Sequence, residues 1–142
     1  MKNNVMLHIC GRQAYLDQDP DVIELTTEGS LTYRDGGWDI RYEESGLTGM
    51  EGVTTEFRVE QDRIVLTRSG KLNSQMIFQQ GLHHDSLYSS EFGTLMITVC
   101  ANRILAQLDS DGGMIDLVYG IEIEQSAVGE VDYHLDIWPI VK

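Results

Sequence analysis

Two charged residues continue apolar strand faces and are the strongest candidates for chemistry in this chain. Glu44 follows Ile40 and Tyr42 at every second position, and Arg68 follows Leu66 in the same way. Alternate residues of a strand point to one face, so we expect both charges to point inward with their apolar neighbours. Because a buried charge is costly unless it is paired, we predict a Glu44–Arg68 ion pair or a network that includes tyrosines.

This pair has two interpretations. In the functional one, Arg68 binds an anionic head group, because a guanidinium fork fits carboxylates and phosphates, and Glu44 orients it. Tyr42 and Tyr119 complete the candidate ligand-binding set. In the structural interpretation, both charges lie at strand ends, where they reach solvent or tie neighbouring strands together.

A metal site is suggested by His83 and His84, which precede Asp85. Adjacent strand residues point to opposite faces, so two neighbouring histidines do not readily reach one ion. His8 and His134 lie far away in the sequence. We therefore predict no metal site and no cofactor, and we interpret the His-His-Asp run as the polar start of a strand.

Two loops match ligand-binding motifs only in part. Segment 109–113 lacks the third acidic position and the closing glutamate of a calcium loop, so we interpret it as a hairpin turn. The glycine-rich segment 46–52 has no lysine and opens no helix, which favours a bulged connection over a phosphate loop. The sequence also lacks GxSxG, HExxH and dinucleotide-binding fingerprints, so it leans away from an enzyme.

The elements that must position these residues are strands. Apolar and polar residues alternate along most of the chain, and no window of 11 residues indicates an amphipathic helix. This alternation puts one strand face on a core and the other in water, which is typical of antiparallel sheet. The expected strands, some of which merge to give nine or ten, are 5–15, 20–27, 30–34, 37–44, 53–60, 63–69, 73–80, 84–89, 94–100, 104–109, 114–124 and 131–140.

Short turns between these runs indicate the topology. Turn sequences occur at 35–37, 60–62, 101–103 and 109–113. Successive hairpins favour an up-and-down meander over a Greek key. An open meander leaves two unprotected edges, and closure removes both. The sequence therefore predicts one all-β domain over residues 1–142, an antiparallel barrel of about eight to ten strands, with a two-sheet sandwich as the alternative.

Charge and composition restrict the partners. The 142 residues include 23 acidic and 10 basic side chains, which gives a formal charge of −13. A hydrophobic content of 42% is enough for a folded core. The excess of negative charge disfavours nucleic acids and anionic membrane surfaces as partners.

The sequence also indicates a compartment. No apolar run approaches the roughly 18–20 residues of a transmembrane helix, and polar residues interrupt the first apolar run too early for a signal-peptide core. Cys10 and Cys100 lie far apart without metal-ligand spacing, which favours two buried thiols over a disulfide. We expect a cytoplasmic protein.

Several segments together resemble one protein family. They are Trp38–Glu44, Gly49–Thr55, Leu66–Gly70, Met76–Phe78 ahead of Gly81, Tyr88 four residues before Phe92-Gly93, and Leu117–Tyr119. In order and spacing they are similar to the YwiB-like family of uncharacterised bacterial proteins, which implies a calycin-type, lipocalin-like β-barrel. Ser90-Glu91 departs from the Thr-Pro expected before the Phe-Gly, which leaves the geometry of that turn open. The resemblance implies a fold and no defined function.

Three functions of different classes follow. The first is a binding module whose barrel holds a small, partly apolar or anionic ligand beside Arg68, Tyr42, Glu44 and Tyr119, since barrel mouths are common pocket sites. The second is a packed barrel whose acidic surface binds a basic protein partner or a second copy of itself, and an exposed Trp138 would support it. The third is a small enzyme, for which no nucleophile and base can be named.

Overall fold

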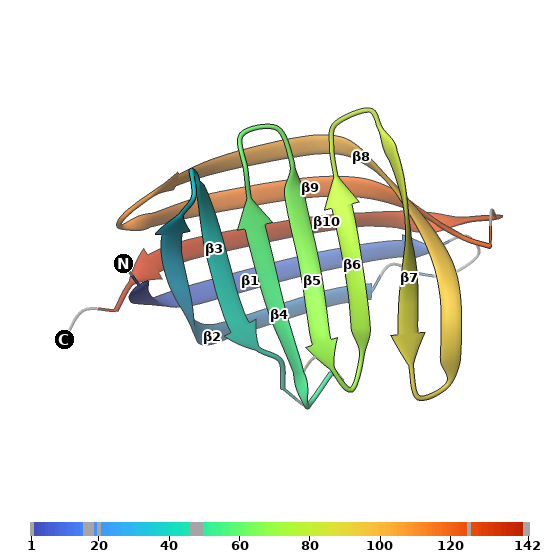
Figure 1. The fold of residues 1–142 in the computed structure, drawn as a ribbon, viewed down its shortest axis with the longest axis horizontal. Helices are drawn as coiled ribbons and strands as arrows, with labels where there is room; N and C mark the ends of the chain where they lie inside the picture. Colours follow the sequence, from blue (N-terminus) through green and yellow to red (C-terminus); the bar gives the residue numbers. More distant parts are fainter. Residues whose placement is uncertain (1, 16–18, 20, 46–49, 125, 141–142) are drawn as a thin grey trace.

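Ten antiparallel strands make up the fold (Figure 1). The computed structural model describes residues 2–15, 19, 21–45, 50–124 and 126–140. The strands are β1 Lys2–Tyr15, β2 Asp21–Arg34, β3 Gly37–Glu43, β4 Val53–Val59, β5 Ile64–Gly70, β6 Asn73–Phe78, β7 His83–Ser90, β8 Gly93–Asp109, β9 Gly112–Ile123 and β10 Ser126–Pro139.

The strands form a closed barrel. Each pairs with its neighbours in the chain, and β1 also pairs with β10, which gives the order β1-β10-β9-β8-β7-β6-β5-β4-β3-β2. In Figure 1 the short strands β3 to β7 cross the long strands β1, β8, β9 and β10 at a steep angle. This confirms the predicted up-and-down barrel and excludes the two-sheet sandwich. Within the described ranges, no helix has the length and apolarity needed to cross a bilayer.

The turn predicted at residues 101–103 is wrong, because this segment is a β-bulge inside β8. The pairing of β8 with β9 shifts between Ala101 and Arg103, and the expected strands 94–100 and 104–109 are one strand. The extra residue changes which face each side chain occupies: Val99 and Ala101 are buried before the bulge, whereas Ile104 packs against the core after it. A polar interruption is common to bulges and turns, so alternation alone did not separate them. The runs 20–27 and 30–34 likewise merge into β2.

Other predicted turns are present. Asp35 and Gly36 form a two-residue hairpin loop with φ angles of 51° and 78°, which suits the right-handed strand twist. Between β4 and β5, the Glu60 N–H donates to the Arg63 carbonyl at 2.9 Å. In the turn between β7 and β8, the Phe92 N–H donates to Ser90 Oγ at 3.2 Å. The sequence departs from the family pattern at Ser90-Glu91, and this bond shows how that turn is held.

The barrel interior is arranged in layers of side chains that lie opposite one another on β3 to β6. One layer is apolar and buried: Ile40, Phe57, Leu66 and Met76. The next layer, which continues onto β7, is polar or amphipathic: Tyr42, Thr55, Arg68, Ser74 and Tyr88. The interior therefore changes from apolar to polar toward one end of the barrel, and that end holds the candidate site.

Candidate functional site

Glu44 and Arg68 form an ion pair inside the barrel. Arg68 Nε lies 4.0 Å from Glu44 Oε2, and the two side chains are 13% and 1% exposed, respectively. Thr55 Oγ1 donates a hydrogen bond of 2.7 Å to the same carboxylate oxygen. The Glu44 N–H donates to the Val53 carbonyl at 2.8 Å, which holds the backbone of Glu44 directly after β3. The pairing expected from the alternating strand faces is present.

Strand register brings the two charges together. The carboxyl ends of β3 and β5 meet the amino end of β4, because successive strands are antiparallel. Thr55 on β4 lies opposite both Tyr42 on β3 and Arg68 on β5. This short polar side chain between the two strands leaves room for the guanidinium and contributes its own bond to Glu44.

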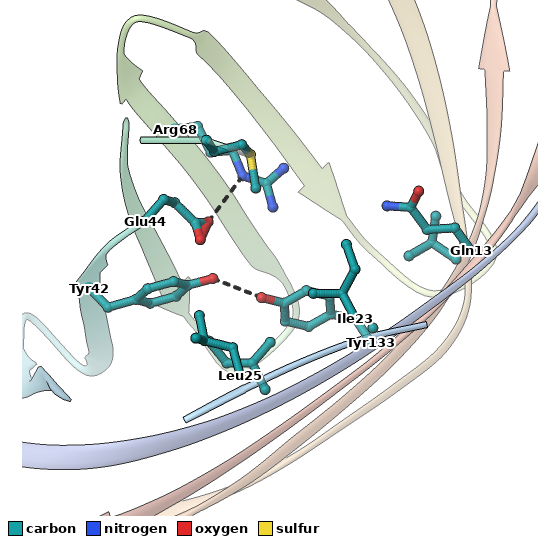
Figure 2. Close-up of a pocket in the computed structure, with 11 residues that line it drawn as sticks. Gln13, Ile23, Leu25, Tyr42, Glu44, Arg68 and Tyr133 are labelled. Atoms are coloured by element: carbon teal, nitrogen blue, oxygen red, sulfur yellow. Dashed lines mark hydrogen bonds and ion pairs between the residues drawn. The ribbon is translucent and has the colours of Figure 1, made fainter. Parts of the chain in front are cut away.

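The guanidinium of Arg68 keeps unused donor capacity. Its Nε is fully buried, and none of the residues described by the structure accepts a hydrogen bond from it. The distance of 4.0 Å to Glu44 is too long for a hydrogen bond, although it allows charge attraction. Figure 2 shows the two terminal nitrogens of the guanidinium directed away from Glu44. The group is therefore placed to donate to a further acceptor.

Two tyrosine hydroxyls form the second polar element of the site. Tyr42 on β3 and Tyr133 on β10 lie with their hydroxyl oxygens 2.9 Å apart (Figure 2). Burial raises the pKa of Tyr42 to about 12, and the negative charge of Glu44 adds to this effect. Burial also raises the pKa of Tyr133 well above its usual value of 10.0. Both hydroxyls are protonated at neutral pH, so the two tyrosines form a neutral hydrogen-bonded pair close to Glu44 and Arg68.

These polar groups line a cavity of about 60 Å³ at one end of the barrel. Gln13, near the end of β1, lies across from Arg68 in Figure 2. A single water needs roughly 10–15 Å³, so this partly open space holds several water-sized groups. The remaining wall is apolar apart from glycine: Ile9, Gly11, Ile23, Leu25, Met50 and Val131.

Three of the four candidate site residues line this cavity, and Tyr119 does not. Tyr42, Glu44 and Arg68 are part of the lining, whereas the Tyr119 ring packs against Phe78 in the core, with the ring centroids 4.6 Å apart. Sequence reasoning missed Tyr133. Alternation places Tyr133 on the inward face of its strand, but no local pattern shows which distant residue it meets.

The other polar candidates lie apart from the cavity. His83 lies opposite Cys100 across β7 and β8, and His84 Nε2 is 2.8 Å from Gln79 Oε1. Part of the glycine-rich connection, residues 46–49, is outside the described residues. Among the side chains that the structure describes, no group of three or more His, Cys, Asp and Glu is placed to hold a metal ion.

Two features of the barrel's outer face differ from expectation. His8 and His134, which the sequence leaves apart, lie on the neighbouring strands β1 and β10, where Asp136 is opposite His8 and 3.1 Å from His134 Nε2. Cys10 and Cys100 are free thiols as expected, but they are half-buried rather than buried. Outward-facing positions of a strand keep such side chains partly in contact with water.

Comparison with known proteins shows similarity to a bacterial β-barrel. The model of the family described as "Domain of unknown function (DUF1934)" matches residues 7–137. The "Uncharacterized beta-barrel protein YwiB" of Bacillus subtilis (strain 168) is 26% identical over 119 residues, which cover 84% of this chain and 79% of the relative. The crystal structure of the ywiB protein from Bacillus subtilis matches with a TM-score of 0.80 at 21% identity, and the match covers 95% of this chain and 92% of that one.

Proposed function

This chain belongs to the DUF1934 family, and we propose that it is a binding module that holds a small polar ligand at one end of its barrel. One observation carries the proposal. The buried Nε of Arg68 has no acceptor among the described residues and lies at the wall of a cavity that also contains a tyrosine pair. A ligand oxygen in that cavity would supply the missing acceptor.

The length of the ion pair favours this interpretation over a purely structural role. A buried donor without a partner costs about 1–3 kcal/mol. A pair retained for stability alone is therefore expected to close to hydrogen-bond distance. The Arg68 and Glu44 side chains stay 4.0 Å apart, while Glu44 is held by Thr55. This geometry suits an arginine that Glu44 orients and that also donates hydrogen bonds to a bound ligand.

The ligand must be small. Drug-sized ligands occupy pockets of roughly 300–1,000 Å³, whereas this cavity measures about 60 Å³. Most of the interior is filled by a single cluster of buried apolar side chains that includes Phe57, Phe78 and Leu135. The enclosed part of the ligand is then a polar head group with a short apolar portion.

The test combines native mass spectrometry with ligand-observed NMR. The protein is purified gently from its own host, and its native mass is compared with its denatured mass. It is then screened by saturation transfer against a set of acids, amides, alcohols and amino acids of about six non-hydrogen atoms or fewer. We expect a small adduct that is lost on denaturation, or at least one fragment that binds.

Two variants locate the binding. Arg68→Met keeps the aliphatic stem and removes the donors, so it should lose binding at least tenfold. Arg103→Met removes an exposed guanidinium, 61% accessible and paired with Asp116 on the outer face, and should bind like the wild type. If the wild type binds nothing by either method, or if Arg68→Met binds as well as Arg103→Met, the proposal is wrong.

A second candidate function is binding of a protein partner. It is favoured by apolar side chains that remain in water: Phe92, 92% exposed in the β7–β8 turn, Leu87 on β7, and Trp138 at the end of β10. Exposed aromatic residues are enriched where proteins bind one another. The same native spectra count subunits, so a dimer that carries no small adduct would favour this function.

A further inference from the structure

We propose that the ligand is a zwitterion, a free α-amino acid with a very short apolar side chain, bound through its carboxylate to Arg68 and through its ammonium group to Glu44. The inference rests on the proposed function and names the chemical class of its ligand. It comes from the charge balance of the cavity, from the spacing of the two charged groups and from the cavity's size.

The charges that line the cavity sum to zero. Among its eleven lining residues, Glu44 carries one negative charge and Arg68 carries one positive charge, and the other nine are uncharged. A guest with a net charge would leave one buried charge uncompensated, which is costly in a shielded site. A simple anion would also add negative charge to a protein that already carries a formal charge of −13. A zwitterion places opposite charges against both groups and keeps the total at zero.

The spacing of the two groups suits an α-amino acid. Glu44 Oε2 and Arg68 Nε are 4.0 Å apart, and both side chains line the cavity. An α-amino acid carries its ammonium and carboxylate groups on adjacent carbon positions, so the two can reach such neighbouring partners together. The carboxylate of the ligand accepts from the guanidinium, whose two terminal nitrogens are directed away from Glu44 in Figure 2. A carboxylate accepts at about four lone-pair sites, so bonds to protein groups such as Thr55 and a bond from a ligand ammonium group are compatible at Glu44.

The size and walls of the cavity select a short side chain. Its volume of about 60 Å³ accommodates several water-sized groups, which suits a small amino acid such as glycine or alanine. The walls opposite the charged pair are formed by apolar side chains such as Leu25 and Val131. Their contact favours the methyl group of alanine over the bare hydrogen of glycine.

The test uses four matched compounds: L-alanine, propionate, ethylamine and propionamide. Propionate lacks the ammonium group, ethylamine lacks the carboxylate, and propionamide carries no charge. Each is titrated into ¹⁵N-labelled full-length protein, and the shifts of amides in β3, β5 and β10 are followed. We expect alanine to bind with a Kd in roughly the micromolar to millimolar range, given its few atoms. The other three should bind at least tenfold more weakly.

A variant pair tests the charge balance directly. Glu44→Gln keeps a side chain that can accept from Thr55 but makes the cavity lining positive, so propionate should now bind at least tenfold more tightly than alanine. Glu130→Gln makes the same change on the exposed face of β10 and should keep the order found for the wild type. If Glu44→Gln does not fold, the order of the four compounds on the wild type decides.

The outcomes separate this inference from the proposed function. If propionate or propionamide binds the wild type as well as alanine, the pocket binds ligands but the zwitterion inference is wrong. If a folded Glu44→Gln variant still binds alanine more tightly than propionate, Glu44 does not bind the ammonium group and the inference is also wrong. If neither these compounds nor the wider fragment set binds the wild type, and no native adduct is found, both proposals are overturned.

Discussion

At the scale of single residues, the buried tyrosine pair couples the site to pH. Tyr42 and Tyr133 lie on strands β3 and β10, and their hydroxyl groups bond to each other inside the barrel. Burial raises the pKa of both, that of Tyr42 to about 12, so both are protonated in the folded protein. A group whose pKa is raised by folding stabilises the fold fully below its unfolded pKa. That contribution is lost as pH rises toward the folded pKa.

We therefore expect the free energy of unfolding to fall as pH rises from 10.0 toward about 12. A shift of two pKa units corresponds to roughly 3 kcal/mol for Tyr42. Urea unfolding at a series of pH values from neutral upward measures the loss. The loss should be smaller in Tyr42→Phe, which lacks the ionisable group, and unchanged in Tyr33→Phe, because Tyr33 is 54% exposed. An equal loss in all three proteins would contradict this assignment.

The sequence predicts which residues of the site point into the barrel, because that depends only on alternation along each strand. Glu44 and Arg68 each follow an apolar residue two positions earlier, so their inward direction was readable. Their distance was not, because it depends on the register of β3, β4 and β5. Tyr133 was not predicted as a site residue, since it meets Tyr42 across 91 positions of chain. Tyr119 has the same inward direction but lies against Phe78, away from the cavity.

At the scale of elements, close strand packing leaves no room for a side chain at the neighbouring glycines Gly112 and Gly113 of β9. Gly113 has a φ of 140°, and a Cβ atom there would overlap the backbone carbonyl oxygen of Gln107 on β8. Gly120 on the same strand has open space at the corresponding position. Gly113 and Gly120 therefore have different roles, and of these two only Gly113 is required by the pairing of β8 with β9.

Substitution by alanine should separate the two positions. Gly113→Ala must move backbone or adopt a strained conformation, so we expect a loss of about 2–4 kcal/mol in the free energy of unfolding. Gly120→Ala meets no neighbouring atom and should change it by no more than about 1 kcal/mol. Urea unfolding of both variants makes the comparison. Similar stabilities would show that the β8–β9 hairpin relaxes around the added methyl group.

At the scale of the whole molecule, the number of paired residues between neighbouring strands differs around the barrel. β6 and β7 share two residue pairs, Asn73 with Ser89 and Ser74 with Tyr88, whereas β8 and β9 pair along almost their whole length. The connection after β6 contacts β8 rather than β7, because the Gly81 N–H donates to the Ala101 carbonyl at 2.9 Å. The β6–β7 pairing, which we call the seam, therefore has the fewest paired residues among the described strand pairings of the barrel.

Hydrogen exchange should detect this seam. Backbone amides exchange faster where ladder hydrogen bonds are fewer and local opening is easier. In β6, the amides that face β7 within residues 75–78 should exchange at least tenfold faster than those of residues 115–119 in β9. Amide exchange of the native protein, followed by NMR, gives both rates in one experiment. Equal protection in the two segments would show that the seam opens no more easily than the rest of the barrel.

The sequence by itself determined most of the strands and their inward faces and favoured a closed antiparallel barrel over a two-sheet sandwich, because a period of two and short turns are local properties of the chain. It also indicated the inward direction of Glu44 and Arg68. Only the tertiary structure decided that residues 101–103 form a bulge, that Tyr133 meets Tyr42, and that the cavity measures about 60 Å³. These features depend on how the barrel curves and how its opposite walls approach. Alternation states which face a residue occupies, and it carries no information about what lies across the interior.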